Sequence, residues 1–333
     1  MTKNIKIALL VGLFFVLFIY VVNVFGSYFM PLEAANLNDG EIKNGKIIFF
    51  SWRPDSGLYI LDKDGIKLFT KDAGIGRCSN DGNYFMHFYG ENALAIRRID
   101  NRKIEKIIEI PKEYAMVSFD WSLDGSKICF TSNTMEGVHD FSNLFVYDID
   151  TAEIKQLTFF KGSTPWSITN PKWSPDGKKI VFECPKNIEK GDDGPPISIF
   201  TINSDGTDMK DMLLNSGVSS GGNPSWSPDG EKIVFITHYD GEKYNDVFII
   251  NVDGSNLKRL TNDPWQDKNP VFSPEGQQIC YVSPRHDNIM FGSELFVVNI
   301  DGIGMARITP PYKRKDSSPL RQWATDDFPQ WSK

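Results

Sequence analysis

The sequence has 333 residues, of which 41% are hydrophobic and 24% are charged, a balance typical of a globular protein with a large core. The formal net charge is −7, and the whole excess lies in residues 46–333, because residues 1–45 carry three lysines and three acidic residues. This acidic balance argues against nucleic acid or an anionic lipid surface as a partner of the folded part.

The first predicted element is an apolar run, residues 7–25, that contains no charged side chain. As a helix it would span about 28 Å, close to the thickness of the hydrocarbon core of a bilayer. The run exceeds the apolar core of about 7 to 15 residues found in secretory signals, which favours an uncleaved signal-anchor over cleavage at "VFGS", residues 24–27. Lys3 and Lys6 precede the run and the next basic residue is Lys43, so the positive-inside rule places the N-terminus in the cytoplasm. We therefore predict a cytoplasmic tail (1–6), one transmembrane helix in the cytoplasmic membrane (7–25), a linker (26–45) and an extracytoplasmic domain (46–333), periplasmic or extracellular.

A repeated phrase dominates the rest of the chain. Its copies begin at Cys78, Trp121, Trp173, Trp226 and Phe272, with a stub at Trp331, and "WSPDGKKIVF" is typical. Ser-Pro-Asp-Gly has the chemistry of a turn, because Pro presets φ, Asp bonds to nearby backbone and Gly accepts a positive φ. The flanking runs are rich in β-branched and aromatic residues and therefore predict strands. Four strands in each unit, repeating at 43 to 59 residues, indicate the blades of a β-propeller.

The two ends of this region complete one another. The first unit, beginning at "NGKIIFF" (residues 44–50), lacks the initial strand of the other units, and "FPQWS" (residues 328–332) resembles that strand. We therefore predict an all-β, six-bladed propeller over residues 46–333, closed by pairing of its N- and C-terminal strands, with no open sheet edge at the junction.

The repeats resemble those of a known family. "NPSWSPDGEKIVF" (residues 223–235), followed by "DVFIINVDGSNLKRLT" (residues 246–261), is similar to the WD40-like repeats of the TolB-like six-bladed β-propeller family, and the resemblance covers residues 46–333. It implies an extracytoplasmic scaffold that binds other proteins. The resemblance does not identify the chain as TolB itself, which has an additional N-terminal α/β domain, whereas here about 20 residues separate the predicted anchor from the first blade.

The connections of the predicted blades differ between the two rims. Turns after strands one and three are short and rich in Asp-Gly, whereas loops after strands two and four vary in length and composition. Variable loops on a rigid ring are where binding residues concentrate. Three of the four histidines, His139, His238 and His286, fall on the variable rim, and His87 replaces a core Phe and is predicted to be structural.

Three tryptophans, Trp166, Trp265 and Trp323, also lie on the variable rim, five or six residues before the Pro of the next blade. This regular placement is consistent with a packing role in the repeat or with an exposed platform for stacking. The motif "GVSSG" (residues 217–221) fits a catalytic serine pattern, but it lies in a polar connection and lacks the required strand–turn–helix context.

Two functions follow from these residues. The preferred prediction is a non-catalytic receptor or scaffold that needs no cofactor and binds a protein or glycan partner of the cell envelope on the variable rim. The alternative is a metal-assisted lyase of acidic oligosaccharides, of the oligogalacturonate type, with a metal ion held by His139, His238 and His286.

Overall fold

The computed structural model describes residues 46–51, 57–71, 76–79, 81–134, 142–160, 168–186, 196–214, 216–218, 220–239, 241–284, 294–309 and 326–332. The predicted tail, membrane anchor and linker lie outside these residues. Within the described ranges, no helix is long and apolar enough to cross a membrane.

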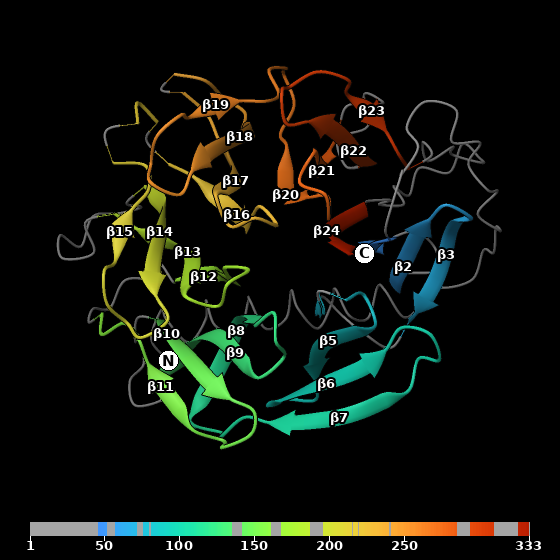
Figure 1. Cartoon of the computed structure of the whole chain (residues 1–333), viewed down its shortest axis with the longest axis vertical. Coiled ribbons are helices and arrows are strands. Elements are labelled where there is room, and N and C mark those ends of the chain that lie inside the picture. The colour runs from blue at the N-terminus through green and yellow to red at the C-terminus, as the bar shows by residue number, and fades with distance from the viewer. Residues whose placement is uncertain are drawn as a thin grey trace, which may run out of the picture.

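The described strands form six antiparallel sheets of four strands, arranged around a centre as the blades of a propeller (Figure 1). Blade 1 contains β24 (Asp326–Ser332), β1 (Lys46–Ser51), β2 (Gly57–Asp62) and β3 (Gly65–Thr70). Blade 2 contains β4 (Gly76–Cys78), β5 (Tyr84–Tyr89), β6 (Ala93–Arg98) and β7 (Ile104–Glu109). Blade 3 contains β8 (Tyr114–Trp121), β9 (Lys127–Thr134), β10 (Asn143–Asp148) and β11 (Ile154–Gln156).

The remaining three blades repeat the same order from the centre outward. Blade 4 contains β12 (Thr169–Trp173), β13 (Lys179–Pro185), β14 (Ile197–Asn203) and β15 (Lys210–Asp211). Blade 5 contains β16 (Gly222–Trp226), β17 (Lys232–Thr237), β18 (Asp246–Asn251) and β19 (Lys258–Arg259). Blade 6 contains β20 (Lys268–Phe272), β21 (Gln278–Ser283), β22 (Glu294–Asn299) and β23 (Ala306–Arg307). The predicted all-β, six-bladed architecture is confirmed.

The predicted closure is also confirmed. Strand β24, the last of the chain, pairs antiparallel with β1, the first, so that Lys46 lies opposite Ser332 and Ser51 opposite Asp326. A register shift between Ile48 and Phe50 interrupts the ladder. In Figure 1 the red β24 occupies the innermost position of the blue blade, so blade 1 is built from both ends of the region.

The Ser-Pro-Asp-Gly turns form as their chemistry predicts. In blade 4, the Ser174 hydroxyl donates to Asp176 Oδ1 at 2.7 Å and accepts the amide of Lys179 at 2.9 Å. Gly177 has φ of 68°, a left-handed conformation that glycine adopts without a Cβ penalty. The turn thus joins β12 to β13 with its own side-chain hydrogen bonds, and one rim of the ring consists of such short connections.

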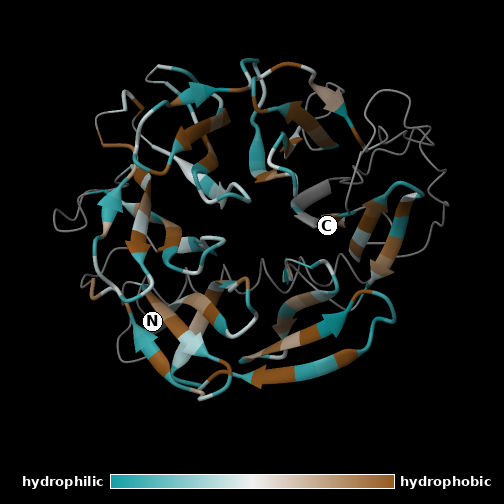
Figure 2. Ribbon diagram, in the orientation of Figure 1, coloured by the Kyte–Doolittle hydropathy of each residue, from teal (hydrophilic) through white to brown (hydrophobic). Residues whose placement is uncertain are grey.

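The core lies between the blades, where apolar faces of successive sheets meet (Figure 2). Trp173 of blade 4 packs with Cys129 and Leu144 of blade 3, and Trp226 of blade 5 packs with Val181 of blade 4. One aromatic or imidazole ring at the same second-strand position of every blade is fully buried: Phe49, His87, Phe130, Phe182, Phe235 and Tyr281. The prediction that His87 is a core residue is therefore confirmed. The four cysteines are free thiols, of which Cys78 is half-buried and the other three are buried.

Candidate functional site

The two rims of the ring differ in the length of their connections. We call the rim formed by the connections after strands two and four of each blade the loop rim, and the opposite one the turn rim. The difference is seen in blades 3 to 6: on the turn rim residues 174–178 join β12 to β13, whereas on the loop rim residues 186–196 join β13 to β14 and residues 284–293 join β21 to β22. In blade 2 the loop-rim connection between β5 and β6, residues 90–92, is short. Long connections carried on rigid strands are suited to binding a partner.

Two of the six residues predicted for a binding rim lie in the described part of the chain, and both belong to the loop rim of blade 5. His238 follows β17, is half-buried, and its Nδ1 lies 2.7 Å from Asn245 Oδ1. Trp265 precedes β20, is half-buried, and its amide donates to Asp263 Oδ1 at 3.2 Å. Trp166, Trp323, His139 and His286 lie outside the described residues, so the histidine metal site and the tryptophan platform stay predictions.

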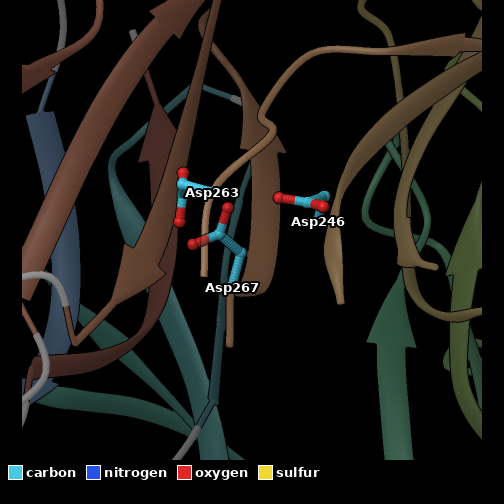
Figure 3. A group of neighbouring side chains, drawn as sticks. All are labelled: Asp246, Asp263 and Asp267. Carbon is cyan, nitrogen blue, oxygen red and sulfur yellow. The ribbon is translucent and has the colours of Figure 1, made fainter. Parts of the chain in front are cut away.

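Close to these two residues the structure brings together three aspartates (Figure 3). Asp246 begins β18, and Asp263 and Asp267 lie in the connection from β19 to β20. One carboxylate oxygen of each lies within 4.8 Å of the others, and Asp246 and Asp267 are fully buried. Carboxylate oxygens in such a group are ligands that hard divalent cations prefer. Sequence reasoning did not single out these residues, although "NDPWQD" places two acids around Trp265.

Neighbouring side chains form ion pairs and hydrogen bonds with two of the three aspartates. The Arg259 guanidinium forms an ion pair with Asp246 and donates to Glu242 Oε1 at 2.9 Å. The Thr261 hydroxyl lies 2.7 Å from Asp267 Oδ2 and 3.1 Å from Asp246 Oδ1. Burial raises the pKa of Asp246 and the neighbouring Arg259 opposes that rise. Arg259 and Thr261 therefore account for the position of Asp246 without a bound cation.

The blade 6 counterparts show that part of the cluster belongs to the repeat. Glu294 begins β22 as Asp246 begins β18, and it pairs with Arg307 at 3.5 Å. The Thr309 hydroxyl accepts the amide of Leu295 at 2.9 Å, as Thr261 accepts the amide of Val247 at 2.8 Å. The acid, arginine and threonine thus hold strands three and four together in both blades. Asp267 also has a counterpart, since Asp326 stands three residues before Pro329 as Asp267 stands before Pro270, whereas the place of Asp263 after the threonine is taken by Pro311 in blade 6.

The two rims also differ in which large apolar side chains they expose. Among the described residues, every exposed Phe and Tyr lies in a connection of the loop rim or at the strand end that adjoins it: Phe159 and Tyr239 are in connections, and Phe88 and Tyr89 end β5. Phe159 is 72% exposed, and Leu214 on the same rim is 70% exposed. The exposed large apolar residues on the turn rim are the aliphatic Leu123, Ile303 and Met305. Aromatic side chains are enriched in the energetic centres of protein interfaces.

Comparisons with known proteins agree with this architecture. Residues 191–322 match the model of the TolB beta propeller domain family. A TolB homolog of Chlorobium luteolum is 33% identical over 187 residues, which are 56% of this chain and 37% of the relative. The Tol-Pal system protein TolB of Francisella tularensis subsp. mediasiatica is 25% identical over 227 residues, which are 67% of this chain and 48% of the relative. The chain thus spans less than half the length of these curated relatives.

Solved structures share the fold at lower identity. TolB from Acinetobacter baumannii is 20% identical, with a TM-score of 0.61 over 86% of this chain and 66% of that one. An oligogalacturonate lyase in complex with manganese is 18% identical, with a TM-score of 0.56 over 76% of this chain and 70% of that one. The fold and the repeats define a six-bladed β-propeller. Residues 191–322 thus match a TolB-like propeller domain, and the identity of the chain to TolB proteins is too low for it to be TolB itself.

Proposed function

We propose that the protein is a non-catalytic binding scaffold of the cell envelope that holds a protein partner on its loop rim. The observation that carries the proposal is the restriction of exposed Phe and Tyr side chains, among the described residues, to that rim. Related proteins carry the name of the Tol-Pal system, which is an assembly of proteins, and this supports a protein rather than a glycan as the partner.

The blade 5 part of the rim is the best-defined place for such contacts. Tyr239 is 39% exposed, packs edge-on against Phe248 with ring centroids 5.4 Å apart, and lies 5.9 Å from the Arg259 guanidinium. A tyrosine held in this way loses little conformational entropy on binding, which is the property of an interface anchor. Trp265 lies on the same rim of the blade.

The test is capture of partners from a membrane extract by the immobilised full-length protein, followed by titration of each captured protein after purification. Tyr239→Ala and Trp265→Ala should each weaken binding about tenfold or more, as truncation of an interface anchor does. Ile303→Ala is the matched control, because Ile303 is 68% exposed but lies on the turn rim. Equal affinity of all three variants for every captured protein would contradict the proposal.

The lyase alternative makes a different prediction for the same rim. It requires His139, His238 and His286 to hold one metal ion, so any single substitution by Ala should abolish metal uptake without loss of the fold. The contact of His238 Nδ1 with Asn245 leaves Nε2 as its available ligand atom. Stoichiometric zinc, manganese or calcium in the purified protein, lost in all three variants and accompanied by cleavage of oligogalacturonate, would favour the enzyme over the scaffold.

We also propose that residues 7–25 anchor the protein in the cytoplasmic membrane and that the propeller lies on the extracytoplasmic side. The support is the charge-free run preceded by Lys3 and Lys6. Protease added to intact spheroplasts should then digest residues 46–333. Complete protection of the propeller, with digestion only after lysis, would place it in the cytoplasm.

A further inference from the structure

Three charged side chains meet at the centre of the ring. Arg77 of β4, Asp120 of β8 and Lys172 of β12 occupy the same position of the innermost strand in blades 2, 3 and 4, one residue before Cys78, Trp121 and Trp173. Arg77 Nε lies 3.5 Å from Asp120 Oδ1, and Lys172 Nζ lies 3.7 Å from the same oxygen. Figure 1 shows the innermost strands β8 and β12 side by side around the centre. The three side chains are 11 to 16% exposed, so solvent still reaches them.

The charges of this group do not balance. Two cations share one oxygen of one carboxylate, while Asp120 Oδ2 accepts the amide of Trp173 at 2.9 Å. The equivalent residues of the other three blades, Gln330, Ser225 and Val271, carry no charge. One positive charge therefore remains uncompensated at this level of the ring.

Arg77 also keeps unused hydrogen-bonding capacity. Its Nη1 donates to the Gly76 carbonyl at 3.0 Å, but its buried Nε makes no hydrogen bond with the residues that the structure describes, since its contact with Asp120 Oδ1 at 3.5 Å is an ion pair only. The residue as a whole is 91% buried, since its exposed fraction is 9%. Donor groups left open on a buried guanidinium are costly unless a further acceptor is bound.

We propose that Arg77 and Lys172 form a binding site for a carboxylate anion at the centre of the ring. The planar guanidinium matches a carboxylate through two parallel N–H donors, and the ammonium adds a point charge from the facing strand. Partial burial strengthens both interactions relative to water. The carboxylate is supplied by a free organic acid or by an acidic side chain of a bound peptide. This site is separate from the loop rim, so its existence does not depend on the scaffold proposal.

The ionisable groups around Lys172 give the site a pH dependence. Burial and the charge of Arg77 from β4 lower the pKa of Lys172 to about 7, while Asp120 from β8 and Cys129 from β9 act in the opposite direction. Below that pKa the group carries its full positive charge, and above it Lys172 becomes neutral and the net charge of the three residues falls to zero. Carboxylate binding should therefore weaken as the pH rises through 7.

The experiment is calorimetric titration of the full-length protein in detergent with two probes, succinate and hexaglutamate. Lys172→Gln should weaken binding about tenfold or more, as loss of a charge-assisted contact does. Asp120→Asn removes the competing carboxylate and should tighten binding. Lys178→Gln, which removes the same charge from a lysine whose side chain is 80% exposed in the turn of blade 4, should leave binding unchanged.

The two probes separate the sources of the anion. Binding of succinate that is lost in Lys172→Gln supports a free organic acid as the ligand, and binding of hexaglutamate alone, lost in the same variant, supports a peptide side chain. Absence of binding for both probes at concentrations up to about 10 mM would overturn the proposal, since that limit lies beyond the millimolar affinity of a weak site. Equal affinities of Lys172→Gln and Lys178→Gln would also overturn it. A thermal melt of each variant confirms that it is folded.

Discussion

At the second-strand position where the other five blades bury Phe or Tyr, blade 2 buries the imidazole of His87. Its neighbours across the sheet are small, because it pairs with Gly76 on β4 and with Ala95 on β6, whereas Phe130, Phe182 and their equivalents face an aromatic ring on strand three. His87 Nδ1 donates to the Phe88 carbonyl at 2.8 Å, and Nε2 is buried without a hydrogen-bond partner among the described residues.

This environment predicts a loss of stability in acid. Burial lowers the pKa of His87 below its usual value of 6.5, and the charge of Arg97 acts in the same direction. Because the pKa is lowered, the folded state binds a proton at His87 less tightly than the unfolded state does. The contribution of neutral His87 to the free energy of unfolding is therefore fully present above about pH 6.5 and is lost as the pH falls through the lower pKa of the folded state. Each pKa unit corresponds to about 1.4 kcal/mol.

The variant His87→Phe tests this prediction, because Phe restores the residue type of the other blades and does not titrate. Its melting temperature should depend less on pH between about pH 7 and pH 5 than that of the parent. His238→Gln is the control, since His238 is a half-buried rim residue and should leave the parent's acid sensitivity intact. The same fall in melting temperature for parent and His87→Phe would show that another group is responsible.

At the scale of elements, the sequence predicts most of what is seen. The Trp-Ser-Pro-Asp-Gly repeat marks the turn between strands one and two, and its β-branched flanks mark the strands, because these signals are local in the chain. Even the assignment of β24 to blade 1 follows from matching one phrase to another. His87 is likewise predictable as a core residue, since it stands in the register of the buried Phe.

Contacts between blades could not be predicted in the same way. Asn170 and Asn223 precede prolines on the innermost strands of blades 4 and 5, and both have φ of 51°, a conformation that Asn tolerates better than most residues. Both residues bond to a third one, Glu183 of β13. Its Oε1 accepts the side-chain amide of Asn170 at 2.8 Å and the backbone amide of Asn223 at 2.5 Å. Glu183 is 40 residues from Asn223 in the chain, so no local pattern reveals that one carboxylate joins two blades.

The candidate site shows the same limit. His238 and Trp265 could be placed on the correct rim from strand counting alone, whereas the grouping of Asp246 with Asp263 and Asp267 depends on how the connection from β19 to β20 folds back over β18. The charge imbalance of Arg77, Asp120 and Lys172 is also invisible in sequence. The three residues belong to three different repeats, and only the folded ring brings their side chains together.

At the scale of the whole molecule, closure of the ring rests on one strand. Deletion of residues 326–333 removes β24 and with it five paired positions along β1. Each backbone hydrogen bond contributes about 1 kcal/mol, and Pro329, which is buried, adds apolar contact. The loss is comparable with a total stability of about 5 to 15 kcal/mol, and the freed edge of β1 would expose unpaired backbone groups. The truncated protein should therefore be aggregated or molten.

The measurement is a thermal melt with analytical ultracentrifugation, and two further samples make it specific to the strand. Gln330→Ala keeps the backbone ladder and removes only a side chain whose amide bonds to the Pro329 carbonyl at 2.9 Å, so it should melt close to the parent. A synthetic peptide of residues 326–333, added in excess, should restore cooperativity to the truncated protein, because the vacant place is a strand-shaped edge. A monomeric, cooperative melt of the truncated protein within a few degrees of the parent would mean that five blades and an incomplete sixth hold the ring without β24.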